Sequence, residues 1–266
     1  MDKSSLFGVI LALIAVGVGM VMKGVSPVVL LNPAAILIIL LGTVAAVVIA
    51  FPLPEIMKVP KLFGILFKEQ KLQDTKELIR LFSDWAQLAR KEGLLALEAR
   101  TNEVEDPFLK NGLSLSVDGQ SAEYIRDVLS EEVEAMEERH RTGALIFTQA
   151  GTYAPTLGVL GAVVGLIAAL GNMSDAEALG HAISAAFVAT LMGIFTGYVL
   201  WHPFANKLKR KSQIEAKQKY LMIEGVLSIL EGEAPRVIEQ KLASYLPVTE
   251  RKKFLEESES SVSANE

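Results

Sequence analysis

The sequence contains no cysteine and only three histidines in 266 residues. Without cysteine, a disulfide framework, a thiolate zinc site and a cysteine nucleophile are excluded. One Glu-x-x-His pair occurs, Glu137 with His140, but a di-iron helical bundle needs two such pairs and further carboxylates. No histidine is followed four residues later by another metal ligand: His140, His181, His202. We therefore expect no metal site and no cofactor.

Catalytic signatures are missing as well, since the sequence has no G-x-S-x-G, no H-E-x-x-H and no P-loop. It also has no long basic run interleaved with aromatic residues, and its formal net charge is −5. Nucleic acid is therefore not an expected partner. Nothing in these patterns supports an enzyme.

Charge is absent from two long stretches, 142–174 and 182–206, which contain no Asp, Glu, Lys or Arg. A bilayer core about 30 Å thick requires roughly 20 apolar residues in a helix, so each stretch can span a membrane. Two more apolar segments lie near the start, and the second begins at Asn32-Pro33, in the order of helix cap and first turn. A signal peptide is not expected, because no clear cleavage site follows the first segment.

These segments predict an all-α integral membrane protein with four transmembrane helices. A cytoplasmic helical domain is expected between spans 2 and 3, and a C-terminal cytoplasmic helical segment after span 4. The expected spans are about 5–22, 33–51, 145–170 and 182–202. The expected division is a hairpin at 1–53, a domain at 54–141, a hairpin at 142–203, a segment at 204–255 and a disordered tail at 256–266, which is acidic and serine-rich.

Basic residues flank the spans on one side. The outer loop expected at 171–180 contains Asp175 and Glu177 but no Lys or Arg. By the positive-inside rule, the lysine-rich flanks and both termini are cytoplasmic. The basic flanks follow span 2 and span 4: Lys58, Lys61, Lys68 and Lys71, then Lys207, Lys209, Arg210 and Lys211.

The charged region between spans 2 and 3 has helical periodicity. Its first apolar stripe contains Leu78, Leu81, Phe82, Trp85, Leu88 and Ala89. A loop is expected around Asp106-Pro107 and Asp118-Gly119. An acidic helix is expected at 121–141, with its apolar face formed by Ile125, Val128, Leu129, Val133 and Met136.

Small residues recur at helical spacing in spans 3 and 4. Two G-x-x-x-G pairs allow close helix packing, Gly161 with Gly165 and Gly193 with Gly197. Each pair lies on a longer small-residue face, which adds Ala154 and Gly158 in span 3 and Ala186 and Thr190 in span 4.

No span contains a carboxylate, although proteins that move ions usually carry one within the membrane. Either the chain moves no ions, or another chain supplies the titrating group. Pro155 and Pro203 could kink spans 3 and 4 and free backbone carbonyls, or simply mark helix boundaries. The spans do contain hydroxyls: Thr43, Thr152, Thr156, Ser184, Thr190 and Thr196.

Three segments resemble the MotA/PomA family of flagellar motor stator subunits, especially those of Bacillus-type bacteria. They are Ala-Phe-Val-Ala-Thr-Leu-Met-Gly-Ile-Phe at 186–195 with the later Pro203, Tyr-Ala-Pro-Thr-Leu-Gly at 153–158, and Ala-Arg-Lys-Glu-Gly-Leu-Leu-Ala-Leu-Glu at 89–98. The resemblance covers essentially the whole chain except the tail.

The resemblance implies a homo-oligomer, expected to be a pentamer, around two MotB-type single-span subunits that each supply an ion-binding aspartate. Ion flow would produce torque on the rotor protein FliG, in the bacterial inner membrane at the flagellar basal body, with membrane lipid around the spans. By position, Thr190, Ala162 and Thr156 would belong to the ion pathway. Pro155 and Pro203 would couple conformation to ion flow, and Arg90 and Glu98 would contact the rotor.

We predict protons as the ion, because sodium-driven members of the family tend to offer threonine hydroxyls from both spans 3 and 4. Here span 3 has Ala162 at the corresponding place. One alternative is a TolQ/ExbB-like proton-channel subunit that energises another envelope system, although that group has three spans. An independent transporter or membrane enzyme would need its own polar site within the membrane.

Overall fold

The computed structural model describes residues 3–70, 72–171 and 176–263, with side chains described to residue 258. Within these ranges every regular element is helical. Four helical segments are long and apolar enough to cross a membrane, which confirms the predicted number of spans. Three sequence-based expectations fall outside the described residues, namely those for Lys71, for Asp175 and for the last part of the tail, 264–266.

The chain divides into two compact units. The membrane unit comprises residues 1–70 and 139–211, and the polar unit comprises 71–138 and 212–266. The membrane unit extends beyond residue 53, the predicted end of the first hairpin. The reason is aromatic packing, because Phe63 lies 5.2 Å from Phe147 and 6.2 Å from Phe204 between ring centroids.

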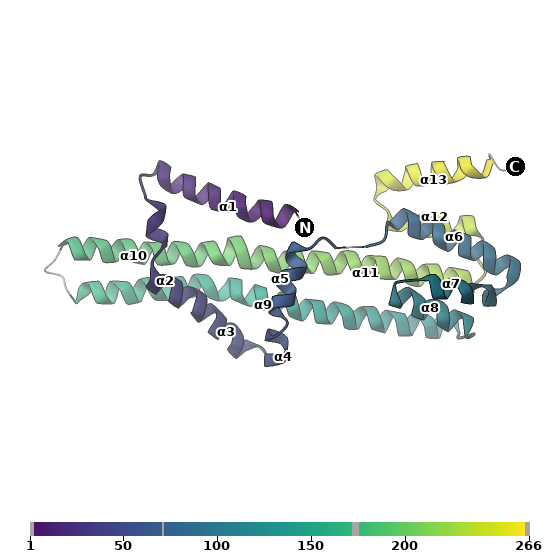
Figure 1. Ribbon diagram of the computed structural model, residues 1–266, viewed down its shortest axis with the longest axis horizontal. Helices are drawn as coiled ribbons and strands as arrows, with labels where there is room; N and C mark the ends of the chain where they lie inside the picture. The colour runs from purple at the N-terminus through teal and green to yellow at the C-terminus, as the bar shows by residue number, and fades with distance from the viewer. Residues whose placement is uncertain (1–2, 71, 172–175, 264–266) are drawn as a thin grey trace. The chain divides into compact units, whose positions relative to one another are not determined.

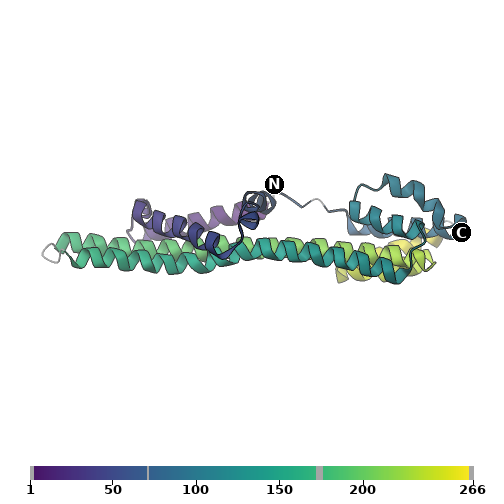
Figure 2. The ribbon, with the colours of Figure 1, turned by 90° about the horizontal axis from the view of Figure 1, so that it is seen from below.

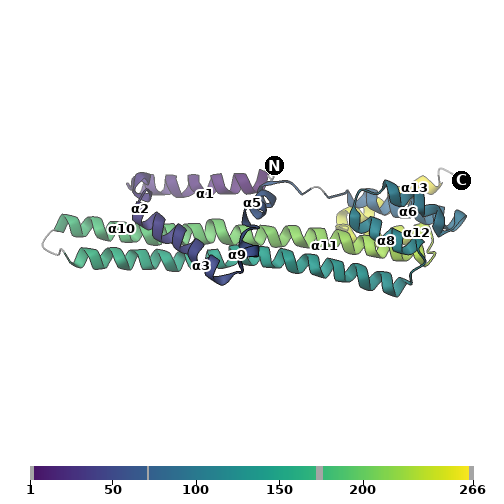
Figure 3. The same ribbon diagram turned by 60° about the horizontal axis from the view of Figure 1, so that its bottom comes forward.

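Within the membrane unit, α9 and α10 run side by side, as all three ribbon views show (Figures 1, 2 and 3). The predicted cap of the second span is present, since Asn32 accepts a hydrogen bond of 3.2 Å from the backbone N–H of Ala35. In chain order the helices that contribute to this unit are α1 Lys3–Met22, η1 Pro27–Leu30, α2 Pro33–Ile36, η2 Leu37–Leu41, α3 Gly42–Ala50, α4 Leu53–Ile56, α5 Val59–Phe67, α9 Ala122–Leu170, α10 Ala176–Phe195, η4 Thr196–Trp201 and α11 His202–Leu230.

A lysine holds the end of α5 against the chain segment that begins α11. The Lys211 ammonium donates hydrogen bonds of 2.7 Å and 2.6 Å to the carbonyl oxygens of Ile65 and Lys68. The last carbonyls of a helix have no intrahelical donor and carry partial negative charge, so a cation there stabilises the helix end. Only 8% of Lys211 is exposed.

The polar unit has its own hydrophobic core. The predicted stripe on α6 faces inward, with Leu78, Phe82 and Trp85 buried. Phe82 packs so closely against α11 that a Cβ on Gly225 would lie 2.6 Å from its ring. Besides parts of α9 and α11, the elements are α6 Thr75–Glu92, η3 Leu94–Ala96, α7 Leu97–Glu103, α8 Pro107–Val117, α12 Pro235–Leu242, η5 Ala243–Tyr245 and α13 Val248–Ser263.

Two segments differ from the sequence-based expectation. The expected loop after residue 105 contains helix α8, which Asp106 caps by accepting from the N–H groups of Phe108 and Leu109 at 2.8 Å and 3.2 Å. Helix α13 continues through 256–263, where we expected a disordered tail. Its anchor is Phe254, which is 1% exposed.

Candidate functional site

Two glycines bring the backbones of α9 and α10 into direct contact. A Cβ built on Gly193 would lie 2.7 Å from the Ala154 carbonyl oxygen and 2.9 Å from the Cα of Gly158. A Cβ built on Gly158 would lie 2.9 Å from the Ala189 carbonyl oxygen. Side chains do not tolerate backbone atoms at these distances, so the separation of the helices requires glycine at both positions.

The four glycines predicted for helix packing differ in their surroundings. Gly193 and Gly197 lie at the contact with α9. Gly161 has ordinary space, because its Cβ would lie 3.6 Å from the Ala189 Cβ. A Cβ on Gly165 would meet no atom of the described residues within 4 Å, so no close approach within this part of the chain requires glycine there.

Pro155 lies inside α9 and changes the backbone beside this contact. Because proline has no N–H, the Gly151 carbonyl one turn earlier lacks its usual intrahelical donor. A Cβ on Gly197 would lie 2.8 Å from that carbonyl oxygen and 2.8 Å from the Pro155 Cγ. Gly197 therefore allows η4 to pack directly over the freed carbonyl.

The second predicted coupling residue, Pro203, lies two residues after the end of a π-helical segment, η4. There the N–H of His202 donates to the carbonyl of Gly197, five residues earlier. π segments within α-helices are rare and are frequent at functional sites. Pro203 removes another backbone donor in the following turn. Both prolines thus lie beside irregular backbone hydrogen bonding. The ring of His202 also packs closely on α9, since a Cβ built on Gly151 would lie 2.8 Å from it.

Of the predicted ion-pathway residues, Thr190 and Ala162 are half-buried. Ala189 of α10 and Gly161 of α9 face each other in the α9–α10 contact. Thr190 directly follows Ala189, and Ala162 directly follows Gly161, so both residues lie next to that contact. Thr190 donates a 3.2 Å hydrogen bond to the carbonyl of Ala186. The side chain of Ala162 offers no oxygen ligand.

The third predicted pathway residue, Thr156, is exposed and belongs to a row of hydroxyls on α9. Thr148, Thr152 and Thr156 are four residues apart and therefore share one helix face. Each hydroxyl donates to the carbonyl four residues earlier at 3.1 Å. Because these donors are used within α9, the face presents hydroxyl oxygens mainly as acceptors.

The predicted rotor-contact residues lie on either side of a sharp turn in the polar unit. Arg90 is in the last turn of α6, Glu98 is in the first turn of α7, and Gly93 between them has φ of +87°. Both side chains are exposed. In the described part of the chain, neither forms an ion pair, so both charges are available to another protein.

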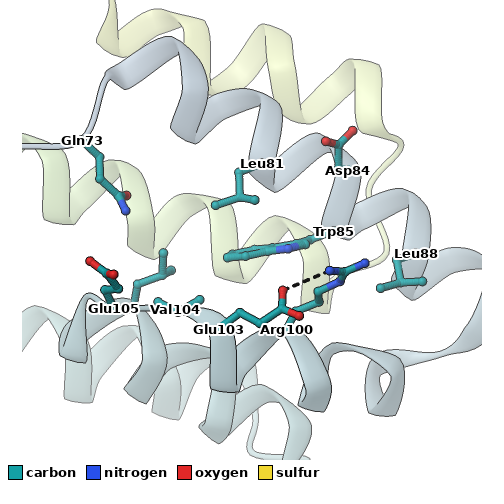
Figure 4. Close-up of a pocket in the computed structure, with 10 residues that line it drawn as sticks. Gln73, Leu81, Asp84, Trp85, Leu88, Arg100, Glu103, Val104 and Glu105 are labelled. Atoms are coloured by element: carbon teal, nitrogen blue, oxygen red, sulfur yellow. Dashed lines mark hydrogen bonds and ion pairs between the residues drawn. The ribbon is translucent and has the colours of Figure 1, made fainter.

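A cavity of about 550 Å³ lies next to this turn, between α6, α7 and α8 (Figure 4). The indole of Trp85 forms one wall and is 5% exposed. Arg100 and Glu103 form an ion pair of 3.0 Å at the opposite wall. The sequence did not reveal this cavity, because Trp85 was recognised only as part of the apolar stripe. Its lining also includes Gln73, Leu81, Asp84, Leu88, Val104, Glu105 and Leu109.

A charged network connects three helices elsewhere in the polar unit. Burial raises the pKa of Glu224, but hydrogen bonds and charge from Arg126 and Lys241 outweigh it and leave this pKa below its ordinary value. The two cations lie 2.7 Å and 3.3 Å from the carboxylate oxygens. Among the described residues, no group of three His, Cys, Asp or Glu could hold a metal ion.

Two family models match the chain. One, described as the MotA/TolQ/ExbB proton channel family, matches residues 100–220. The other, described as motility protein A N-terminal, matches residues 6–93. Together they span the membrane segments and most of the polar unit.

Relatives match over nearly their full length. The chain is 71% identical to Motility protein A of Bacillus subtilis, over 97% of this chain and 96% of that protein. It is 34% identical to the chemotaxis protein PomA of Vibrio alginolyticus, over 96% of this chain and 99% of that protein.

Solved structures agree with this fold. A chain of the flagellar MotAB stator complex from Bacillus subtilis matches with a TM-score of 0.91 and 71% identity, covering 95% of this chain and 99% of that chain. A chain of the C. jejuni MotAB structure matches with a TM-score of 0.89 and 34% identity, covering 93% and 97%.

Proposed function

The chain belongs to the motility protein A (MotA) family, and we propose that it is a stator subunit of a bacterial flagellar motor. With a MotB-type partner it forms a proton channel and converts ion flow into torque on the rotor. The relatives named above are motility proteins, and the similar structures are MotAB stator complexes. The family matches indicate no catalytic enzyme family, and the proposed role is transport and mechanical coupling.

The observation that carries this proposal is the absence of an acidic residue from the four apolar spans. A proton pathway needs a group that binds and releases protons, and hydroxyls do not do so near neutral pH. The aspartate is therefore supplied by the single transmembrane helix of the MotB-type partner. The exposed hydroxyl face of Thr152 and Thr156 is suited to face such a helix or the water beside it.

The proposed ion is the proton. Thr190 supplies one hydroxyl near the α9–α10 contact, whereas Ala162 supplies none. A dehydrated sodium ion needs several oxygen ligands, but a proton can move through water and hydroxyls to a carboxylate. One proton crossing about 100 mV releases about 2.3 kcal/mol, which is enough to bias a packed helix pair between two arrangements.

Coupling is assigned to Pro155 and Pro203, since each lies beside irregular backbone hydrogen bonding in a membrane span. The output is assigned to Arg90 and Glu98. These exposed charges would contact FliG electrostatically. The assembly is proposed to be a pentamer, surrounded by membrane lipid in the inner membrane at the flagellar basal body.

Both termini are placed in the cytoplasm. The hairpins at 1–53 and 142–203 would lie in the membrane, and 54–141 and 204–255 in the cytoplasm. Reporter fusions after Lys23 and at Asp175 should then read outside, whereas fusions at Asp118 and after Lys211 should read inside. An inside reading at Asp175 would contradict the four-span orientation.

A deletion strain provides the decisive test of function. Restoring this chain with its MotB-type partner should restore swimming, whereas either chain alone should not. The purified chain alone should also fail to conduct ions in vesicles. Conduction by the chain alone would favour an independent transporter, and rescue of an envelope system without swimming would favour a TolQ/ExbB-like subunit.

A further inference from the structure

The cavity beside Trp85 has an apolar wall and an acidic rim, and we propose that it binds an arginine of a peptide segment from a partner protein. The cavity lies between α6, α7 and α8 of the polar unit and has a volume of about 550 Å³ (Figure 4). This volume is within the range of small-molecule sites, so the cavity can hold one large side chain and the backbone next to it.

The wall of the cavity suits the long side chain of arginine. The indole of Trp85 forms one side of it and is 5% exposed. The rest of the apolar surface comes from four further side chains, Leu81, Leu88, Val104 and Leu109. Arginine packs its methylene groups on such side chains and keeps its charged end in water. A guanidinium also stacks favourably on an aromatic ring.

The rim of the cavity favours a cation. Three carboxylates line it, those of Asp84, Glu103 and Glu105, whereas Arg100 is the one cation among the described lining residues. Arg100 is paired with Glu103 at 3.0 Å. The side chains of Asp84 and Glu105 form no ion pair or hydrogen bond within the described chain, and both are exposed. Two negative charges are therefore uncompensated and can pair with a guanidinium from another protein.

The indole N–H of Trp85 is a second and independent indication of an occupant. It donates to no acceptor among the residues that the structure describes, although the side chain is almost fully buried. A buried donor without an acceptor is unfavourable. A metal ion or a protonated polyamine offers no acceptor, whereas a peptide offers a carbonyl oxygen at every residue. The need for both a cation and an acceptor favours a peptide segment over a free cation.

The cavity adjoins the turn that bears the proposed rotor contacts. Leu88 and Arg100 line it, and each is two residues from a rotor-contact residue, Arg90 or Glu98. The binding inference goes beyond the stator function and does not depend on it, because it requires only a basic segment that reaches the polar unit. Its test measures peptide binding and not motility, so its failure would leave the proposed function unaffected.

Fluorine NMR of the full-length chain in complex with its MotB-type partner provides the measurement. Fluorotryptophan replaces the two tryptophans of the chain, and phenylalanine variants assign their resonances. The probe is the peptide acetyl-Ala-Ala-Arg-Ala-Ala-amide, titrated at constant ionic strength. We expect a saturable shift of the Trp85 resonance. The Trp201 resonance belongs to the membrane unit and should not move. Absence of a saturable shift at Trp85 would overturn the proposal.

Two further probes separate the charge from the carbonyl. The same peptide with citrulline in place of arginine keeps the shape but has no charge, and it should bind about tenfold more weakly, as expected for the loss of two partly exposed ion pairs. Ethylguanidinium keeps the charge but has no carbonyl, and it should bind about fivefold more weakly. Equal binding of the citrulline peptide would overturn the proposal. Ethylguanidinium binding as tightly as the arginine peptide would identify a free-cation site and would also overturn it.

Charge variants locate the site on the chain. Asp84→Asn and Glu105→Gln should each weaken binding of the arginine peptide about threefold. The matched controls are Asp127→Asn and Glu131→Gln, because these exposed carboxylates of α9 do not line the cavity. Each control should change binding less than about twofold, since solvent and salt screen distant surface charges. Equal losses in all four variants would show a general effect of surface charge and would overturn the proposal, as would unchanged binding in both cavity variants.

Discussion

Gly193 and Gly158 lie in backbone contact across α10 and α9, with 2.9 Å between the Cα of Gly158 and the position of a Cβ on Gly193. The neighbouring atoms belong to the backbone and cannot rotate away as a side chain could. The separation of these helices is therefore set by the absence of two side chains.

Gly193→Ala should consequently force the helices apart and destabilise the membrane unit by about 1–3 kcal/mol, the usual cost of overpacking. Gly165→Ala is the matched control, since its Cβ would meet nothing within 4 Å. Thermal unfolding of the purified complex in detergent measures the difference. Equal stability of the two variants would contradict the close contact.

Pro155→Ala should leave assembly intact but reduce torque. Alanine supplies an N–H to the Gly151 carbonyl and thereby completes the hydrogen-bond ladder of α9, which stiffens this part of the helix. Pro203→Ala should act in the same direction. Rotation of tethered cells at matched expression provides the measurement. Normal torque in both variants would mean that the two prolines affect only local helix geometry and do not contribute to coupling.

Reversing either Arg90 or Glu98 should impair swimming without removing the protein from the membrane, because both charges are exposed and not paired within the described chain. Reversal of an opposite charge on the rotor should restore part of the swimming speed. Lys110→Glu is a suitable control, since Lys110 is an exposed lysine on α8 of the same unit. Unchanged swimming in the Arg90→Glu, Glu98→Lys double variant would argue against a rotor contact.

Swimming should continue in sodium-free medium at fixed pH and stop when a protonophore is added. The reason is that Thr190 supplies a hydroxyl in span 4, whereas Ala162 in span 3 has no side-chain oxygen. Ala162→Thr would add an oxygen ligand and should leave protonophore sensitivity unchanged. Motility that needs sodium and survives the protonophore would show that the assignment of the proton as the transported ion is wrong.

Acid should weaken the polar unit through Glu224. Its pKa is lowered in the folded chain, so its ionised form stabilises the fold above the ordinary glutamate pKa of about 4.3. That stabilisation is lost as the pH falls from the ordinary glutamate pKa through the lower pKa that Glu224 has in the folded chain. Glu224→Gln should lose about 1 kcal/mol at neutral pH, a value discounted because Arg126 is half exposed.

Thermal unfolding of wild type and Glu224→Gln at pH 7, 5 and 3 tests this expectation. The difference between the two proteins should be largest at pH 7 and should shrink at pH 3. A constant difference across the three values would mean that the carboxylate charge is not responsible.

The four spans could be predicted from the sequence because uninterrupted apolar length leaves few alternatives. The predicted cap at Asn32 and the inward face of α6 follow equally local rules, and the structure has both. The signature segments at 153–158 and 186–195 were sufficient to identify the family. Composition and short motifs thus determined the architecture and the type of function.

The register of the α9–α10 contact could not be predicted. Gly158, Gly161 and Gly165 share one helix face, so spacing alone does not show which of them meets the partner helix. That choice depends on the crossing point, which involves the packing of both helices. The prediction emphasised the G-x-x-x-G pair of Gly161 and Gly165, whereas Gly193 of α10 approaches α9 most closely at Ala154 and Gly158.

Helix α8 illustrates an ambiguity of local signals. Asp106-Pro107 was interpreted as a loop because both residues favour turns, but Asp and Pro also begin helices as cap and first residue. The helix that follows is stabilised by burial of Phe108, Leu109 and Leu113. Only the tertiary structure reveals those contacts, and the same is true of the cavity at Trp85.

The buried ammonium of Lys211 makes it a reporter of local opening. Amine-reactive reagents modify accessible lysines, so Lys209, two residues away and exposed, should acquire label rapidly. Lys211 should acquire it only when the end of α5 separates from α11 and releases the two carbonyls. The ratio of the two labelling rates would therefore record how often this docking is undone, and comparing energised with de-energised membranes would show whether the working cycle includes that event.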